Sequence, residues 1–260
     1  MIHCLLPSLP DDCTVRGDAA HHLQVLRVRP GESLELLDGA GHILPATIAD
    51  VTKREVRYTP CGTVRTLPRP TPSVTLFQCI AKAAHMEWLV EKAVELGADE
   101  LVPVLSRNCV SRPDAGSTVP RWDRIADAAL EQCGGAWRPR IAPVHTWAQA
   151  LDRARAFPGA VLTAALPEGT PQLREVLAQL PQSQQTDGQT GRPTDRPTDR
   201  QTDGPTDRHY ALFVGPEGDF ADFELDDLRA AGSRFIGLGP TVLRTDTATI
   251  AALACLRLLG

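Results

Sequence analysis

Two glycine-containing turns near the carboxyl terminus, each directly after a short apolar run, constrain the fold of this 260-residue chain most. The apolar run 210–214 leads into Gly-Pro-Glu-Gly at 215–218, and the run 235–238 leads into a second turn at 239–247. In an open α/β sheet, ligands bind in the crevice beyond the carboxyl ends of the strands. Glycine in such a turn lets the backbone approach a ligand closely. The pattern therefore predicts a small-molecule site near the end of the chain.

The chain from Ser73 onward alternates short apolar runs with amphipathic segments. This alternation favours an α/β fold, a parallel sheet with helices on both faces. The predicted strands are 74–80, 101–105, 161–166, 210–214 and 235–238. The predicted helices are 86–96, 120–132 with a proline near its start, 147–156 capped by Thr146, 171–180 capped by Thr170, 222–231 and 247–259.

The amino-terminal region has a β pattern instead. Several short apolar runs separated by turn signals indicate a small barrel. Those runs are 33–37, 43–48 and 55–58, with one helical stretch at 18–28. Three prolines in 67–72 lack backbone donors and cannot continue a central strand, so we expect a linker there. The predicted domains are therefore 1–70 and 73–260.

A polar repeat interrupts the second predicted domain. Thr-Asp units recur between 186 and 208 with no apolar side chain among them. Such a segment has nothing to bury that would offset the entropy of ordering. We expect 183–208 to be a disordered insertion in a surface loop, where added length costs little.

Composition excludes several classes of protein. The net charge of −5 argues against a strongly basic nucleic-acid binder, so any RNA contact needs a local basic surface. The seven cysteines are scattered without a paired motif, which favours reduced thiols in the cytoplasm and no metal site. No apolar run is long enough to span a bilayer, so we expect no membrane contact. Phosphate-loop, dinucleotide-binding and hydrolase motifs are missing from the sequence.

The ordered set of short motifs resembles the RsmE family of the SPOUT superfamily, the 16S ribosomal RNA uracil-N3 methyltransferases. Nearly the whole chain takes part, apart from 182–208. The matching segments are Gly215-Pro-Glu-Gly-Asp-Phe220, Leu238 to Ala248, His85-Met-Glu-Trp88 to Gly97, Val102 to Arg107, Glu131-Gln-Cys-Gly134, and His21 to Arg27 with Pro30-Gly31 and Asp38-Gly39.

The resemblance implies a specific fold and reaction. The fold would be a SPOUT-type parallel sheet whose carboxyl-terminal segment forms a trefoil knot, preceded by a PUA-like β-barrel. The cofactor would be S-adenosyl-L-methionine, the substrate 16S rRNA within the small ribosomal subunit, and the active form a homodimer. The cofactor would be held by loops after three strands, through Thr163, Ala164, Leu166, Val214, Gly215, Pro216, Glu217, Gly218, Leu238, Gly239, Val242, Leu243 and Thr247.

The chemistry of the implied reaction suggests further roles. N3 of neutral uracil carries a proton, so a proton acceptor or a cation that stabilises the anion is needed beside it. Arg244 is our first candidate for holding the base or its developing charge. Glu217 and Asp246 are candidates for accepting the proton or orienting Arg244, although Asp246 could also simply favour the positive end of the last helix.

Four residues are candidate RNA contacts, namely Lys82 and Arg107 near strand ends and His21 and Arg27 in the amino-terminal region. The chain departs from the family pattern at several positions that bear on these contacts. Asp246 stands where glutamate is usual, and His85, Gly135 and Gln24 stand where basic residues are usual.

Two other functions are compatible with the sequence. One is a ribosome assembly factor that binds RNA but has lost catalysis, although the retained Gly-Pro-Glu-Gly and Leu-Arg-Thr segments argue against it. The other is a related methyltransferase that acts on a different RNA.

Overall fold

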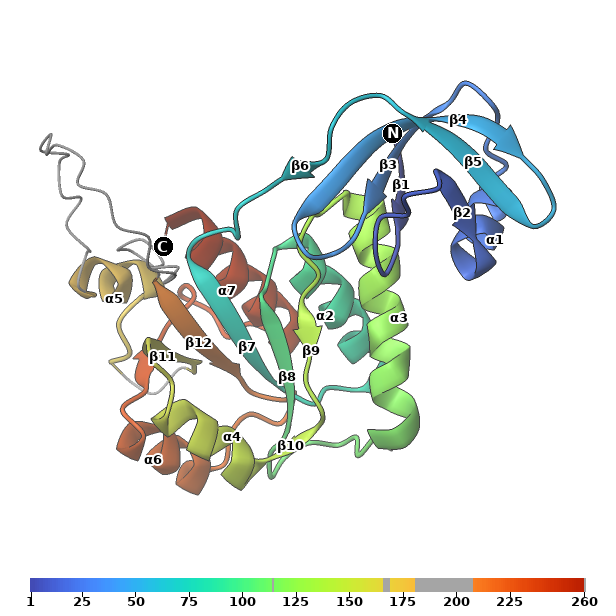
Figure 1. Cartoon of the computed structure of the whole chain (residues 1–260). Helices are drawn as coiled ribbons and strands as arrows, with labels where there is room; N and C mark the ends of the chain where they lie inside the picture. Colours follow the sequence, from blue (N-terminus) through green and yellow to red (C-terminus); the bar gives the residue numbers. More distant parts are fainter. Residues whose placement is uncertain (114, 166–168, 181–207, 260) are drawn as a thin grey trace, which may run out of the picture.

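The computed structural model describes residues 1–113, 115–165, 169–180 and 208–259, and it contains two parts, each built on its own sheet (Figure 1). The insertion predicted at 183–208 lies outside the described residues, apart from Arg208. The predicted α/β architecture with a parallel sheet is confirmed.

The amino-terminal sheet has the strand order β1-β3-β4-β5-β2, with β6 pairing β4. Only β1 and β3 run parallel, and the other pairings are antiparallel. One face packs on helix α1 around buried Leu23, Leu36, Ile48 and Val56. The elements are β1 (Ile2–Leu5), β2 (Thr14–Arg16), α1 (Gly17–Val25), β3 (Ser33–Leu37), β4 (His42–Val51), β5 (Glu55–Pro60) and β6 (Arg65–Thr66).

The carboxyl-terminal sheet has the order β10-β8-β7-β12-β11-β13, with β9 on β8, and the pairings between its named strands are parallel. Its strands are β7 (Ser73–Cys79), β8 (Glu100–Leu105), β9 (Arg140–Ile141), β10 (His145–Thr146), β11 (Ala160–Ala164), β12 (His209–Val214) and β13 (Arg234–Ile236). The central strands β7 and β12 are covered on both faces, as nearly continuous apolar runs require. Phe77 and Phe213 stack between them with ring centroids 4.3 Å apart.

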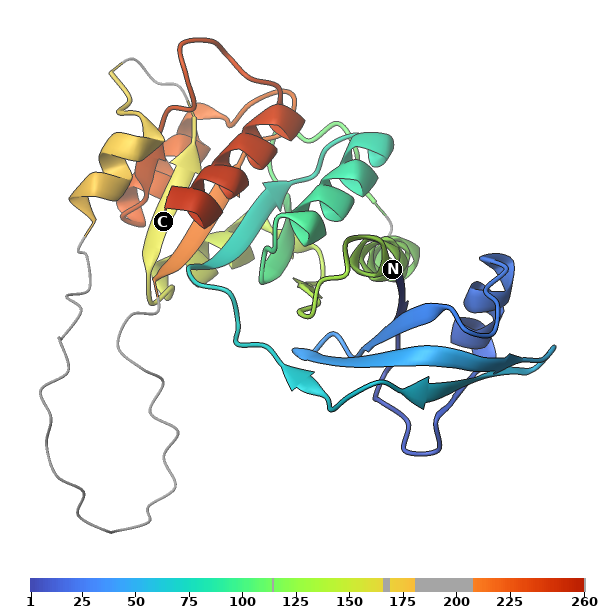
Figure 2. The same ribbon diagram turned by 90° about the horizontal axis from the view of Figure 1, so that it is seen from above.

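Helices cover both faces of this sheet (Figure 2). The helices are α2 (Ala83–Glu95), α3 (Ala115–Cys133), α4 (Trp147–Arg155), α5 (Leu173–Gln179), α6 (Asp222–Ala230) and α7 (Thr245–Leu259). Side chains of α2, α3, α5 and α7 share one apolar core with the sheet, and those of α4 and α6 share another. The predicted cap of α4 is confirmed, since the Gln149 N–H donates to the Thr146 hydroxyl at 3.4 Å.

Four predicted helix starts were wrong. Helix α2 begins at Ala83, three residues before the predicted start. Helix α3 begins five residues before Pro120, which lies inside it, and contact of Val119 with the core offsets the single backbone hydrogen bond that a proline removes. Helix α5 begins at Leu173, and its cap is Gln172 rather than Thr170, with the Gln172 N–H donating to Glu175 at 3.0 Å. Helix α7 begins at Thr245, so Thr247 lies within its first turn.

The two parts of the chain are joined by backbone hydrogen bonds as well as by the linker. The Gly41 N–H donates to the Ala136 carbonyl and the Arg138 N–H to the Gly39 carbonyl, both at 2.9 Å. The indole of Trp137 donates to the Pro68 carbonyl at 3.0 Å. A Cβ on Gly41 would lie 2.4 Å from the Trp137 ring, so glycine is required for this close approach.

The segment Glu131-Gln-Cys-Gly134 also contributes to the contact between the two parts of the chain. The Glu131 carboxylate accepts a hydrogen bond from the Leu5 N–H at 2.8 Å, and the Glu131 carbonyl lies 2.8 Å from Nδ1 of His3. A Cβ on Gly134, whose φ is +69°, would meet the His3 ring at 2.6 Å. This motif therefore joins α3 to strand β1.

We expect Gly41→Ala to lower the free energy of unfolding more than Gly31→Ala does, by about 1–3 kcal/mol, because the added methyl overlaps Trp137. Gly41 and Gly31 both have positive φ, +99° and +90°, so alanine causes backbone strain at either position. A Cβ on Gly31, however, meets nothing within 4 Å. Urea unfolding followed by tryptophan fluorescence would measure both. Equal losses would contradict the tight contact.

Candidate active site

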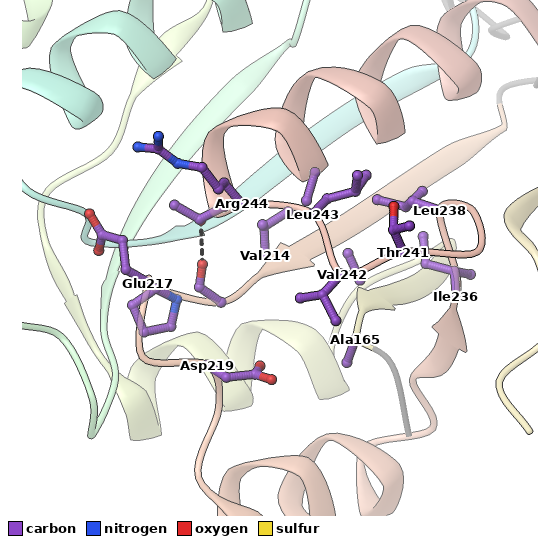
Figure 3. A pocket seen from close by; sticks show the side chains of 15 residues that line it. Ala165, Val214, Glu217, Asp219, Ile236, Leu238, Thr241, Val242, Leu243 and Arg244 are labelled. Carbon is purple, nitrogen blue, oxygen red and sulfur yellow. Dashed lines mark hydrogen bonds between the residues drawn. The ribbon is translucent and has the colours of Figure 1, made fainter. Parts of the chain in front are cut away.

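A cavity of about 370 Å³ lies at the carboxyl ends of β11, β12 and β13, beside the start of α7 (Figure 3). Its volume is within the range of about 300–1,000 Å³ that is usual for small-molecule sites. The wall consists of Ala164, Ala165, Val214, Gly215, Pro216, Glu217, Asp219, Ile236, Leu238, Thr241, Val242, Leu243, Arg244, Thr245 and Ala248. Figure 3 shows Arg244 and Glu217 on one side and Ile236, Leu238 and Thr241 on the other. The cavity therefore has one charged side and one mainly apolar side.

The floor of the cavity is fixed by a buried polar network that joins three segments. The side-chain amide of Gln78 on β7 donates to the Thr245 hydroxyl at 3.2 Å, and the Thr249 hydroxyl donates to the side-chain oxygen Oε1 of Gln78 at 2.6 Å. The Thr245 hydroxyl in turn donates to the Gly215 carbonyl (Figure 3). Gln78 and Thr249 are 0% and 1% exposed. Because buried polar groups are costly when unpaired, this network holds the start of α7 against the end of β12.

The loop after β13 is braced by Gln172. The Gly239 N–H donates to the Gln172 side-chain oxygen at 2.8 Å, and the Gly237 carbonyl accepts from the Leu173 N–H at 2.9 Å. Gly239 has φ +125°, a conformation that suits glycine alone. The apolar side of the cavity is thus held in shape by hydrogen bonds outside it.

The loop after β12 is held from β8 and α6. The Asn108 amide donates to the carbonyls of Gly218 and Asp219, both at 3.1 Å. The Glu224 carboxylate, 0% exposed, accepts from the Arg107 N–H at 2.7 Å and from the Ala221 N–H at 2.9 Å. These bonds fix the Gly-Pro-Glu-Gly turn relative to the segment after β8, a strand that β7 separates from β12.

Charged groups gather at the mouth of the cavity. Nη2 of Arg244 lies 3.7 Å from Oδ2 of Asp246, and the same carboxylate oxygen lies 3.2 Å from Nδ1 of His85. Burial alone would raise the pKa of Asp246. The Thr247 N–H, the charge of Arg244 and the contact with His85 together lower this pKa below its ordinary value. Asp246 is therefore a carboxylate at neutral pH. Glu217 faces α2, where its carboxylate accepts from the Lys82 N–H at 3.0 Å.

Most of the residues predicted to bind a cofactor line this cavity. They are Ala164, Val214, Gly215, Pro216, Glu217, Leu238, Val242 and Leu243. Four other described residues that were predicted to bind the cofactor are not part of the wall, namely Thr163, Gly218, Gly239 and Thr247. The buried hydroxyl of Thr163 lies 2.7 Å from that of Ser233. Leu166 lies outside the described residues.

Sequence reasoning missed several wall residues and the network beneath them. Asp219, Ile236, Thr245 and Ala248 line the cavity without having been predicted, and Ala165 and Thr241 line it from loops that were predicted to surround the cofactor. Gln78 had a usable signal, because an amide inside the apolar run 74–80 must find a buried partner.

The predicted RNA contacts occupy two separate regions. Lys82 and Arg107 are exposed. Their backbone N–H groups donate to the carboxylates of Glu217 and Glu224, which places both residues near the cavity loops. His21 is exposed on α1, and Arg27 is exposed just after it with φ +57°. Figures 1 and 2 both place α1 well away from the amino end of α7. The structure thus does not bring His21 and Arg27 to the cavity of the same chain.

Comparison with known families decides how this site is classified. The family model described as RNA methyltransferase domain matches residues 68–257, and the model described as RNA methyltransferase PUA domain matches residues 15–60. The chain belongs to the RNA methyltransferase family. The cavity and the residues at its mouth lie inside the first match.

Individual relatives agree with this family assignment. The ribosomal RNA small subunit methyltransferase E of Mycobacterium bovis is 29% identical, over 97% of this chain and 89% of that protein. The protein of the same name from Bacillus subtilis is 24% identical, over 94% of this chain and 88% of that protein. The resemblance to the RsmE family is confirmed.

Solved structures extend the likeness to the whole fold. A ribosomal RNA small subunit methyltransferase E from Neisseria gonorrhoeae bound to S-adenosyl methionine has a TM-score of 0.80 at 26% identity, covering 100% of this chain and 98% of that chain. A Legionella pneumophila protein in complex with the bound cofactor SAM has a TM-score of 0.76 at 26% identity, covering 98% and 96%.

The described residues of this methyltransferase lack two kinds of feature. Over these residues, none of the helices has the length and apolar character needed to span a membrane. The same residues contain no group of three or more histidine, cysteine or acidic side chains arranged to hold a metal ion.

We expect Gln78→Leu to lower the free energy of unfolding by about 1–3 kcal/mol, because it leaves buried partners of the amide without their hydrogen bonds. Gln24→Leu is the matched control, since the Gln24 amide donates to the Thr52 carbonyl at 2.8 Å on the exposed surface. That change should stay within about 0.5 kcal/mol of the original protein. Urea unfolding would measure both, and equal losses would contradict the importance of the network.

Proposed function

We propose that this protein transfers a methyl group from S-adenosyl-L-methionine to N3 of a uridine in 16S ribosomal RNA of the small subunit. The observation that carries the proposal is the cavity formed by loops at three strand ends, with Arg244 at its mouth. Family membership and the rRNA small subunit methyltransferases among its relatives support the reaction class. The S-adenosyl methionine bound in the Neisseria gonorrhoeae structure supports the cofactor.

The residues of the cavity are suitable for this cofactor. The apolar side chains of Ile236, Leu238 and Leu243 would hold the adenine, and the backbone groups of the loops after β12 and β13 would bind its polar edges. The loop from Leu238 to Leu243 and the turn at Gly215 would hold the cofactor from two sides. When bound, S-adenosyl-L-methionine supplies a methyl group on a positively charged sulfur.

The charged side of the cavity would receive the nucleobase. The Arg244 side chain is 70% exposed, so its guanidinium is free to contact a base or its developing negative charge. Oδ2 of Asp246 lies 3.7 Å from Nη2 of Arg244 and orients this guanidinium. Asp246 and Glu217, which is part of the cavity wall, are both candidates for accepting a proton. Holding the base in line with the methyl group supplies much of the rate enhancement.

The two parts of the chain have different roles in this proposal. Residues 1–70 form the RNA-binding domain and residues 73–260 the catalytic domain. Lys82 and Arg107 contact RNA beside the cavity, and His21 and Arg27 contact it from the amino-terminal domain. The distance of α1 from the cavity in both views supports a homodimer, in which RNA held at one site can also reach the partner subunit. An rRNA substrate is consistent with a cytoplasmic protein.

We extend the proposal to two features of topology. The amino-terminal sheet closes into a PUA-like barrel, and the carboxyl-terminal segment forms a trefoil knot. Support for the knot comes from the path of the chain, which leaves edge strand β13 and returns as α7 to contact β7 and β12 in the middle of the sheet.

The experiment that tests the function uses small subunits from a strain that lacks the relative of this gene. Incubation with the purified protein and S-adenosyl-L-methionine, followed by mass-spectrometric mapping of the 16S rRNA, should reveal one N3-methyluridine. Cofactor binding without any methylated RNA would favour a catalytically silent assembly factor. Methylation of another RNA instead would overturn the choice of substrate.

We expect Arg244→Ala to lower the methylation rate by at least about 100-fold, because it removes the cation that faces the developing charge. Cofactor affinity by calorimetry and the dimer by light scattering should remain. Arg155→Ala is the matched control, since Arg155 is an exposed residue of α4 paired only with exposed Asp152 among its described ion pairs. Near-normal turnover of the Arg244 variant would refute this role.

A further inference from the structure

An imidazole lies beside the two charged residues at the mouth of the cavity. Nδ1 of His85 is 3.2 Å from Oδ2 of Asp246. Nη2 of Arg244 is 3.3 Å from Nδ1 and 3.5 Å from Nε2 of the same ring. The His85 side chain is 31% exposed, so one edge of the ring remains open to a ligand. These three side chains form one cluster, although they come from α2 and from the start of α7.

The position of His85 is fixed by the helix that carries it. Helix α2 buries Met86 and Leu89 in the core that it shares with α7. Its amino end is held from the opposite side by the bond from the Lys82 N–H to Glu217, a residue of the cavity wall. Because both sides of the first turn are held, His85 faces Asp246 and Arg244 without further rearrangement.

The carboxylate defines how the imidazole can act. Asp246 is itself held by the Thr247 N–H, which donates to its Oδ1 at 2.8 Å. A carboxylate beside Nδ1 favours the tautomer with the proton on Nδ1, and this makes Nε2 the accepting nitrogen, which Nη2 of Arg244 approaches only to 3.5 Å. A base whose other nitrogen is oriented by a carboxylate is the usual arrangement of a proton acceptor in enzymes.

We infer that His85 is the proton acceptor for the target base and that Asp246 is its positioning residue. The inference rests on the proposed function. In the step it describes, the N3–H bond of uracil breaks, the proton bonds to Nε2, and the electron pair stays on N3. The resulting anion faces Arg244, and the imidazolium later gives its proton to water. At this position the RsmE family more often has lysine, so the inference concerns the site of this chain.

Charged groups surround the imidazole. Asp246 from α7 and Arg244 from the preceding loop lie 3.2 Å and 3.3 Å from its Nδ1. Glu217 lies across the first turn of α2 beside Lys82. On α2 itself, Glu87 is paired with Arg121 of α3 at 2.7 Å. The ring is therefore set between one carboxylate and one guanidinium, which suits a group that must both take and release a proton.

The test compares His85→Gln with His145→Gln under single-turnover conditions from about pH 5 to about pH 9, a range that contains the usual titration of histidine. His145 lies on β10 at the other edge of the sheet and has no assigned role, so its variant should match the original protein. His85→Gln should lower the rate by about 100-fold and abolish the rise of the rate with pH. Affinity for S-adenosyl-L-methionine by calorimetry should change by less than about twofold, which also checks folding.

A second measurement does not depend on activity. Nitrogen-15 NMR of the imidazole in the protein without cofactor should show the proton on Nδ1 of His85, and Asp246→Asn should abolish this preference. A wild-type ring protonated on Nε2 alone would overturn the inference. So would a His85→Gln variant with an unchanged rate and pH profile. If the wild-type protein methylates no RNA, the proposed function fails first, and that outcome differs from an active enzyme that tolerates His85→Gln.

Discussion

The hydrogen bonds among Gln78, Thr245, Thr249 and the Gly215 carbonyl are the interaction on which the site depends. They join a strand near the start of the carboxyl-terminal domain to two segments more than a hundred residues later in the chain. A buried amide and two buried hydroxyls have few alternative partners, so a shift of α7 by one residue would leave them unpaired. The network thereby fixes the amino end of α7, with Asp246 in its first turn and Arg244 directly before it. Apolar packing alone would permit more than one position for this helix.

The cavity is pre-formed because its walls are braced from outside. Gln172 holds the loop after β13, and Asn108 and buried Glu224 hold the loop after β12. None of these three side chains is in the wall itself. Their hydrogen bonds supply the rigidity that a site requires to hold two reactants in line. The wall residues remain free to contact a ligand.

The sequence predicted the longer strands and the general place of the site, because both follow from apolar runs and glycine-containing turns. It missed the short strands β1, β2, β6, β9 and β10, which have two to four residues each. Gly215, Pro216 and Leu238 line the cavity because they follow strands whose carboxyl ends meet at one edge. Helix starts were harder to predict, since capping depends on local hydrogen bonds. Gln172 replaced Thr170 as a cap, and α3 extends past Pro120 toward the amino terminus.

Contacts between distant segments were beyond reach of sequence patterns. Nothing in the order of residues indicates that His85 on α2 lies beside Asp246 on α7, because periodicity describes each helix alone. Glu131 likewise belongs to a motif that was noted for its resemblance, and only the fold reveals that it holds strand β1. Residues of one family motif can thus serve assembly rather than chemistry.

The backbone hydrogen bonds between residues 39–41 and 136–138 have a consequence for how RNA would be selected. Rotation of the amino-terminal sheet about the linker would break them and would move Trp137 off Gly41. These contacts therefore oppose a change in the separation and orientation of the two parts. An RNA that contacts both would be chosen partly by its own three-dimensional shape, since its anchoring nucleotides and its reactive nucleotide must match the span that these contacts set.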